Sequence, residues 1–167
     1  MNLYIDFDGV IMDTITSSYK MMEEEGIDPK DYEKSGSFYK KLDWNSFLKE
    51  TKEIHNAFEE IDEIVKSKFF NVNILTHVTS LEEAEAKITF LRKKIKDITI
   101  IVVPKSVEKT KMVNAKDAIL IDDYTDNLRK WERAGGIGVR FSLKLNGKGF
   151  YAIDHLKQII EFVSEKV

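Results

Sequence analysis

The sequence predicts an α/β protein of three layers, in which helices cover both faces of a parallel sheet and a small helical cap is inserted after the first strand. Short apolar segments rich in isoleucine and valine alternate with helical segments along most of the chain, which is typical of parallel strands joined by helical crossovers. These segments are apolar on both faces, as in strands buried between two helical layers. Residues 13–69 separate the first strand from the second, and a simple crossover needs far fewer residues.

Five strands are expected, because five segments are too short for typical helices and carry many β-branched residues. In chain order they are residues 2–7, 71–75, 98–103, 118–121 and 136–141. Ligands of open parallel sheets bind at the carboxyl ends of the strands. The residues that follow these strands are therefore the first candidates for a functional site.

The helices between the later strands have start and stop signals. Ser80 and Glu83 have the spacing of a capping box. Apolar residues then follow at helical intervals: Leu81, Ala84, Ile88, Leu91 and Ile95. A second helix is expected from about residue 126 to 134, where Gly135 ends it. A last helix should follow Asp154, with these residues facing inward: Leu156, Ile159, Ile160 and Val163.

The long insertion has a helical pattern, so residues 14–69 are expected to form the cap and residues 1–13 and 70–167 the core domain. An aromatic cluster lies within the insertion, made of Phe38, Tyr39, Trp44 and Phe47. A small cap must bury apolar surface, so packing is the first explanation of this cluster. Stacking of one or two of these rings on a nucleobase is the alternative.

The composition excludes several classes of function. The chain has 167 residues, enough for one main domain. The net charge of −3 comes from well-mixed charged residues, which argues against binding to duplex nucleic acid. The absence of cysteine excludes disulfides, thiolate metal sites and a cysteine nucleophile. No apolar run is long enough for a membrane helix, and no signal peptide is recognised, so a cytoplasmic protein is expected. The sequence does not predict the oligomeric state.

Two pairs of carboxylates end two of the predicted strands. Asp6 and Asp8 follow the first strand, where the alternation of an extended chain would point both to the same side, and Gly9 lets the chain turn away. Asp122 and Asp123 close the fourth strand. Such carboxylates repel one another by roughly 4 kcal/mol per close pair at an effective dielectric near 20, so they require a cation. A ligand set made only of oxygen atoms suits Mg²⁺.

Taken in chain order, these motifs resemble those of the haloacid dehalogenase superfamily of phosphohydrolases, which have a Rossmann-like core. The family's first motif, Asp-x-Asp-Gly-Val/Thr, is matched by residues 6–10, and its fourth, a strand followed by Asp-Asp, by Asp122 and Asp123. Within the superfamily, the segment 120–128 followed by Trp131 most resembles the 5'(3')-deoxyribonucleotidase-like group.

The other two motifs supply candidate phosphate ligands. The second motif, a Thr or Ser that ends a strand, is matched by Thr76. The third is a lysine near a helix start. Lys109 is the first choice, because Ser106 could cap a helix and place Lys109 in its first turn, and Lys105 is the alternative. The resemblance implies that Thr76 and the lysine bind the phosphoryl oxygens.

The resemblance also assigns the chemistry to the carboxylates. Asp6 would be the nucleophile that forms an aspartyl phosphate, and Asp8 would protonate the leaving group and then activate water. Mg²⁺ would be held by the carboxylate of Asp6, the carbonyl of Asp8, Asp122 and Asp123. Asn127 would orient Asp122 or Asp123 through a hydrogen bond.

The expected activity is that of a Mg²⁺-dependent phosphomonoesterase acting on a small phosphorylated metabolite, with a nucleoside monophosphate as the first hypothesis. Candidate substrate contacts are His77, Phe38, Tyr39 and Trp44. Within enzymes, the alternatives are a phosphatase for sugar phosphates or other metabolites and a nucleic-acid-end phosphatase. From other classes, the alternatives are a receiver-like signalling domain and a catalytically inactive phosphate-binding module.

Overall fold

In the computed structural model, which describes residues 1–166, six parallel strands form one sheet in the order β3-β2-β1-β4-β5-β6. The strands are β1 (Asn2–Ile5), β2 (Asn71–Val78), β3 (Thr99–Pro104), β4 (Ile119–Asp122), β5 (Ile137–Phe141) and β6 (Tyr151–Ile153). The five predicted strands are confirmed, and β6 was not predicted. Because β1 pairs with both β2 and β4, the two acidic motifs lie on adjacent strands although they are far apart in sequence.

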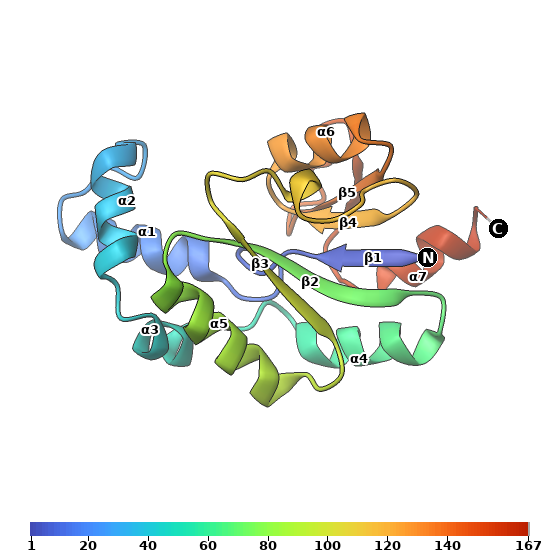
Figure 1. Cartoon of the computed structure of the whole chain (residues 1–167), viewed down its shortest axis with the longest axis horizontal. Helices are drawn as coiled ribbons and strands as arrows, with labels where there is room; N and C mark the ends of the chain where they lie inside the picture. The colour runs from blue at the N-terminus through green and yellow to red at the C-terminus, as the bar shows by residue number, and fades with distance from the viewer. Residues whose placement is uncertain (167) are drawn as a thin grey trace.

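Helices cover both faces of the sheet, which confirms the predicted three-layer α/β fold (Figure 1). One layer contains α4 (Ala57–Ser67), α5 (Leu81–Lys94) and α7 (Gln158–Ser164), whose buried residues share a single apolar cluster with the strands. The opposite layer contains α6 (Thr125–Arg133) and the short 3-10 helix η1 (Lys109–Lys111). Both layers reach the carboxyl end of β1, so side chains can approach that point from either face.

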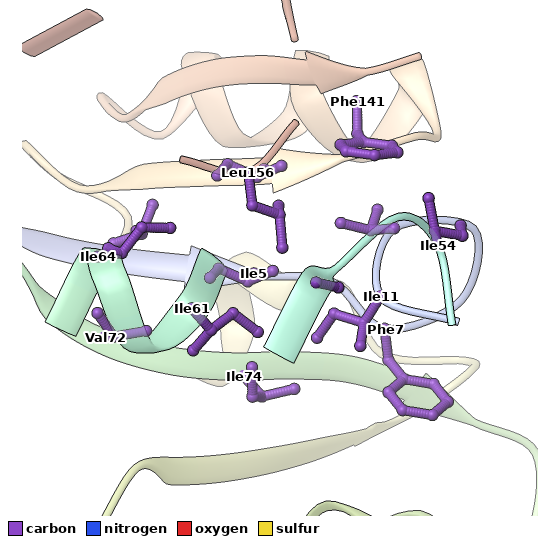
Figure 2. Packing of buried hydrophobic residues seen from close by; sticks show 14 of the residues in the cluster. Ile5, Phe7, Ile11, Ile54, Ile61, Ile64, Val72, Ile74, Phe141 and Leu156 are labelled. Carbon is purple, nitrogen blue, oxygen red and sulfur yellow. The ribbon is translucent and has the colours of Figure 1, made fainter. Parts of the chain in front are cut away.

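The core consists of two apolar clusters, one on each face of the sheet, and both mix aliphatic and aromatic residues. Ile61 and Ile64 of α4 lie beside Ile5 of β1 and the residues of β2 (Figure 2). On the other face, the rings of Tyr4 and Trp131 meet edge to face with their centroids 5.3 Å apart. Burial of these side chains fixes the strands that carry the acidic motifs.

The insertion after β1 contains α1 (Thr14–Glu24), α2 (Tyr32–Lys41) and α3 (Trp44–Glu50), followed by α4. The first two lie beyond the carboxyl end of β1 in Figure 1, and α3 packs against α5. In contrast, α4 packs on the sheet as part of a main helical layer. A cap spanning residues 14–69 as a separate unit stays a prediction, and the part that extends over the strand ends is residues 14–50.

The expected helices are present, with two local differences. Ser80 caps α5 by accepting a hydrogen bond from the Glu83 amide at 3.1 Å, but Leu81 is 85% exposed instead of facing inward. The prediction that Ser106 caps a helix is wrong, because the helix there is η1, a single 3-10 turn whose N-cap is Glu108. No helix within residues 1–166 combines the length and the apolarity that crossing a membrane requires.

Candidate active site

Three carboxylates converge at the carboxyl ends of β1 and β4. The amide of Asp6 donates to the carbonyl of Ile121 at 3.0 Å, which extends the pairing of the two strands to the first acidic residue. One oxygen from each of Asp6, Asp122 and Asp123 lies within 4.8 Å of the others. Asp122 is fully buried and Asp6 is nearly so, so bulk water does little to screen their mutual repulsion.

A buried lysine bridges two of these carboxylates. The ammonium of Lys109 lies 2.9 Å from Oδ1 of Asp6 and 2.7 Å from Oδ2 of Asp122. Asn127 donates its side-chain amide to the same Asp122 oxygen at 3.0 Å, and its orienting role stays a prediction. We call Lys109, Asp6, Asp122 and Asp123 the Lys109 centre.

If all three carboxylates were ionised, the Lys109 centre would carry more negative charge than its own lysine can neutralise. Burial, and then repulsion by Asp122, raise the pKa of Asp6 to about 7 although Lys109 opposes the shift. Burial, followed by repulsion from Asp6 and Asp122, raises the pKa of Asp123 to about 9. Burial alone would lower the pKa of Lys109, but Asp122 and Asp6 raise it overall, so the ammonium stays charged. Three carboxylates around one ammonium therefore fit a hard divalent cation such as Mg²⁺.

Gly9 allows the chain to turn directly against this centre. Its φ of +74° lies in the left-handed region, which costs glycine little. A Cβ atom at this position would lie 2.3 Å from Oδ2 of Asp123. The glycine in the first motif is thus required by the backbone and by the approach of an acidic side chain.

The expectation that an extended strand carries both Asp6 and Asp8 is wrong, because β1 ends at Ile5 and a turn closed by hydrogen bonds to the Phe7 carbonyl follows. Asp8 belongs instead to a second charged cluster. The ammonium of Lys87, carried by α5, lies 2.7 Å from Oδ2 of Asp8 and 2.6 Å from Oε2 of Glu83. Thr14 donates its hydroxyl to the other Asp8 oxygen at 2.7 Å. We call Lys87, Asp8, Glu83 and Thr14 the Lys87 centre.

Sequence reasoning missed Lys87, although one signal could have found it. Lys87 lies three residues after Ala84 and four before Leu91, and all three are buried on the inward stripe of α5. Its spacing of four residues from Glu83 is that of an ordinary surface ion pair. From the sequence, Lys87 therefore resembles a solvent-exposed lysine. Burial lowers the pKa of Lys87, but Asp8 and Glu83 raise it overall, so the group stays charged.

The expected phosphate ligands lie beside these two centres. Thr76 is fully buried, and its hydroxyl is 3.4 Å from the Lys87 ammonium. Lys109 contacts the carboxylates of Asp6 and Asp122, whereas Lys105 is exposed and makes no ion pair among the described residues. His77 pairs through Nε2 with the Val107 carbonyl at 2.8 Å. Burial, and then the nearby lysines, lower the pKa of His77 despite that hydrogen bond, which favours a neutral ring.

The aromatic residues of the insertion pack mainly on one another. Trp44 is 4% exposed, its indole donates to the Tyr39 carbonyl at 3.1 Å, and its ring stacks on that of Tyr39. Phe38 meets Tyr39 edge to face and is also buried. A role of these rings as substrate contacts stays a prediction.

Structural comparisons identify the fold. No protein-family model and no curated protein sequence matches this chain. The chain is similar to a HAD-superfamily hydrolase of subfamily IA from Geobacter sulfurreducens PCA, with a TM-score of 0.65 and 14% identity over 96% of this chain and 98% of the other. It is also similar to β-phosphoglucomutase from Clostridium difficile, with a TM-score of 0.59 and 18% identity over 99% and 96% of the two chains.

A third similar structure is D,D-heptose 1,7-bisphosphate phosphatase from B. bronchiseptica in complex with magnesium and phosphate, with a TM-score of 0.58 and 11% identity over the full length of both chains. At these identities the likeness establishes the fold alone. The strand order and the three layers agree with that fold. The protein thus has the Rossmann-like α/β fold of the haloacid dehalogenase-like hydrolases, and its structural neighbours belong to that superfamily.

Proposed function

We propose that this protein is a Mg²⁺-dependent phosphomonoesterase that works through an aspartyl phosphate. The observation that carries the proposal is the Lys109 centre, where Asp6, Asp122 and Asp123 converge around one ammonium at the carboxyl ends of β1 and β4. A receiver-like domain is less consistent with the chain, because its acidic pair comes early, whereas here Asp122 and Asp123 follow the fourth strand.

The side chains can divide the reaction between them. A carboxylate oxygen of Asp6 attacks phosphorus, the bond from phosphorus to the ester oxygen breaks, and Asp8 gives that oxygen a proton. Water then attacks the aspartyl phosphate and loses a proton to Asp8, and the bond from phosphorus to Asp6 breaks. Lys109 and Thr76 bind the equatorial phosphoryl oxygens, where negative charge must be neutralised.

Mg²⁺ would be held by Asp6, Asp122 and Asp123, together with the carbonyl of Asp8. When bound, it would neutralise charge on the phosphoryl group and keep Asp6 ionised as a nucleophile. This agrees with the raised pKa of Asp6, which in the absence of a cation reaches about 7. Asn127 would keep Asp122 in the orientation that the metal needs.

The substrate is proposed to be a small phosphorylated metabolite, and two classes have support. A sugar phosphate is favoured by the names of two structural neighbours, a phosphoglucomutase and a heptose bisphosphate phosphatase. A nucleoside monophosphate is favoured by the resemblance of segment 120–128 to the 5'(3')-deoxyribonucleotidase-like group. The values of kcat/KM across a panel of sugar phosphates, ribonucleotides and deoxynucleotides distinguish the two, and a profile confined to sugar phosphates would remove the nucleotidase hypothesis.

The activity itself is tested with 4-nitrophenyl phosphate. The purified protein is expected to release phosphate only when Mg²⁺ is present, and Asp6→Asn should reduce kcat at least about a thousandfold, because a nucleophile that acts within a catalytic unit is not replaced by its neighbours. Asp62→Asn is the matched control, since Asp62 is an exposed carboxylate on α4 whose ion pair within residues 1–166 is with Lys66. Full turnover by Asp6→Asn would refute the assignment of Asp6 as the nucleophile. Turnover without metal would refute the role of Mg²⁺.

A further inference from the structure

Lys87 is a fully buried charge that the reaction described above does not use. Its ammonium lies 2.7 Å from Asp8, 2.6 Å from Glu83 and 3.1 Å from the carbonyl of His77. The rings of Phe7 and Trp44 each lie with their centroids 5.2 Å from the same nitrogen. The ammonium is therefore surrounded by two carboxylates, one carbonyl and two aromatic rings.

Fold stability alone gives little reason to keep a lysine here. Removing an ammonium from water is costly, and replacing a buried ion pair by well-packed apolar residues often leaves stability unchanged or raises it. The neighbours of Lys87 on the inward stripe of α5, Ala84 and Leu91, are apolar, so the position needs a charge only because the carboxylates of Asp8 and Glu83 face it. The retained charge acts on its partners, and one of these is Asp8.

The contacts fix the carboxylate of Asp8 at both of its oxygens. Lys87 donates to Oδ2, and Thr14 donates to Oδ1, each at 2.7 Å. The side chain of Asp8 remains 24% exposed, so it can still meet a substrate. These two donors come from two different helices, α5 and α1.

We propose that Lys87 is the positioning residue for Asp8, holding its carboxylate where it can exchange a proton with the leaving-group oxygen. This inference rests on the proposed phosphatase function. Lys87 also joins α5 to α3, because the Trp44 ring packs over the same ammonium. The geometry of the acid–base group is thus tied to the packing of the insertion as well as to the sheet.

The test uses the dependence of kcat/KM on the leaving group in the full-length protein with Mg²⁺. A general acid matters more as the leaving group becomes poorer. Lys87→Met, which keeps a long side chain without charge, should lose about tenfold more activity on phenyl phosphate than on 4-nitrophenyl phosphate, within the range that general acid catalysis supplies. Lys93→Met, at an exposed lysine of the same helix, should leave both values unchanged.

A double-mutant cycle separates positioning from a merely structural role. If Lys87 acts through Asp8, adding Lys87→Met to Asp8→Asn should cause little further loss on phenyl phosphate. Equal losses on the two substrates, or additive losses in the cycle, would overturn the proposal. If Lys87→Met does not fold, Lys87→Gln takes its place, since it retains a neutral donor, and the same steeper leaving-group dependence is expected at smaller size.

These outcomes are distinct from failure of the proposed function. A wild-type protein that hydrolyses neither aryl phosphate contradicts the phosphatase proposal itself. A wild-type protein that needs Mg²⁺ and Asp6, combined with a Lys87→Met variant that loses nothing, contradicts only the role of Lys87.

Discussion

The Lys109 centre and the Lys87 centre have the same arrangement of charged groups on opposite sides of the sheet. In each, a buried ammonium lies within 3 Å of two carboxylates. Lys87 comes from α5 in one helical layer, and Lys109 comes from η1 in the other. The end of β1 lies between them and supplies one carboxylate to each centre.

The two centres differ in how well their charges balance. The Lys87 centre has two carboxylates, and Thr14 donates a further hydrogen bond to Asp8. The Lys109 centre has a third carboxylate, Asp123, whose pKa is raised to about 9 by burial and by its acidic neighbours. The comparison teaches that the contacts of the fold pair Asp8 with donors at both oxygens, whereas the Lys109 centre retains an acidic group, Asp123, that its lysine does not contact. Under the proposed function, a cation and a phosphoryl group would complete the Lys109 centre.

The largest expected effect on stability comes from breaking the Lys109 centre. Lys109→Met should destabilise the metal-free protein by about 3 to 5 kcal/mol, because it leaves Asp6 and Asp122 buried without their cationic partner. Urea unfolding at constant pH measures this. Lys111→Met, at an exposed lysine of the same short helix, should change stability by no more than about 0.5 kcal/mol. Equal stability of the two variants would show that Lys109 does not balance the centre.

The second effect is stabilisation by Mg²⁺. At a free concentration of about 100 times Kd, the metal should add roughly 2.7 kcal/mol, which is a rise in Tm of roughly 5 to 10 °C for a chain of this size. Thermal unfolding with and without Mg²⁺ measures it. Asp122→Asn should lose most of the rise, whereas Glu83→Gln, in the other centre, should keep it.

The raised pKa values determine how the stability of the protein changes with pH. In the folded protein the pKa of Asp6 is about 7 and that of Asp123 about 9, against an ordinary 3.8. Between pH 4 and these values the folded state binds more protons than the unfolded state, so these two groups make the metal-free protein less stable as pH rises. Mg²⁺ competes with those protons and should therefore stabilise more at about pH 8.5 than at about pH 5.5. A stabilisation independent of pH would contradict the assignment of these ligands.

The last prediction tests how closely the first motif approaches Asp123. Gly9→Ala and Gly26→Ala both place a side chain at positive φ, so each should cost about 1 to 3 kcal/mol of stability. Only Gly9 faces a carboxylate, since nothing lies within 4 Å of the Cβ position at Gly26. Mg²⁺ affinity, measured by calorimetry, should fall for Gly9→Ala alone. Equal affinities in the two variants would show that Asp123 does not need this glycine.

Local patterns were enough to predict most of the fold. Strands such as residues 118–121 were recognisable because buried parallel strands are continuously apolar, and α5 because Ser80 caps it. The strand β6 was not predicted, since its three residues carry no periodicity and owe their conformation to pairing with β5. In place of the helix expected after Ser106, the structure has only the 3-10 turn η1. The conformation around Lys109 is set by its tertiary contacts with two carboxylates, which local helix propensity does not reveal.

The candidate site could also be predicted only in part. Asp6, Asp8, Asp122 and Asp123 could be proposed because each pair follows an apolar strand. For Lys87, the spacing from Ala84 and Leu91 places it on the inward stripe of α5 and signals burial. Its partner Asp8 could not be predicted, since that contact depends on α5 packing against the turn after β1.

The central place of β1 in the sheet also affects how the protein is made. The Lys87 centre is complete in the chain once residue 87 has been added, whereas β4 ends at Asp122. At 5 to 20 residues per second, roughly 2 to 7 seconds of synthesis separate the two. During that interval β1 can pair with β2, but its other edge has no β4 to cover it. The strand arrangement that joins the two acidic motifs therefore gives the nascent chain an open apolar edge, the kind of surface on which chaperones act and misfolding begins.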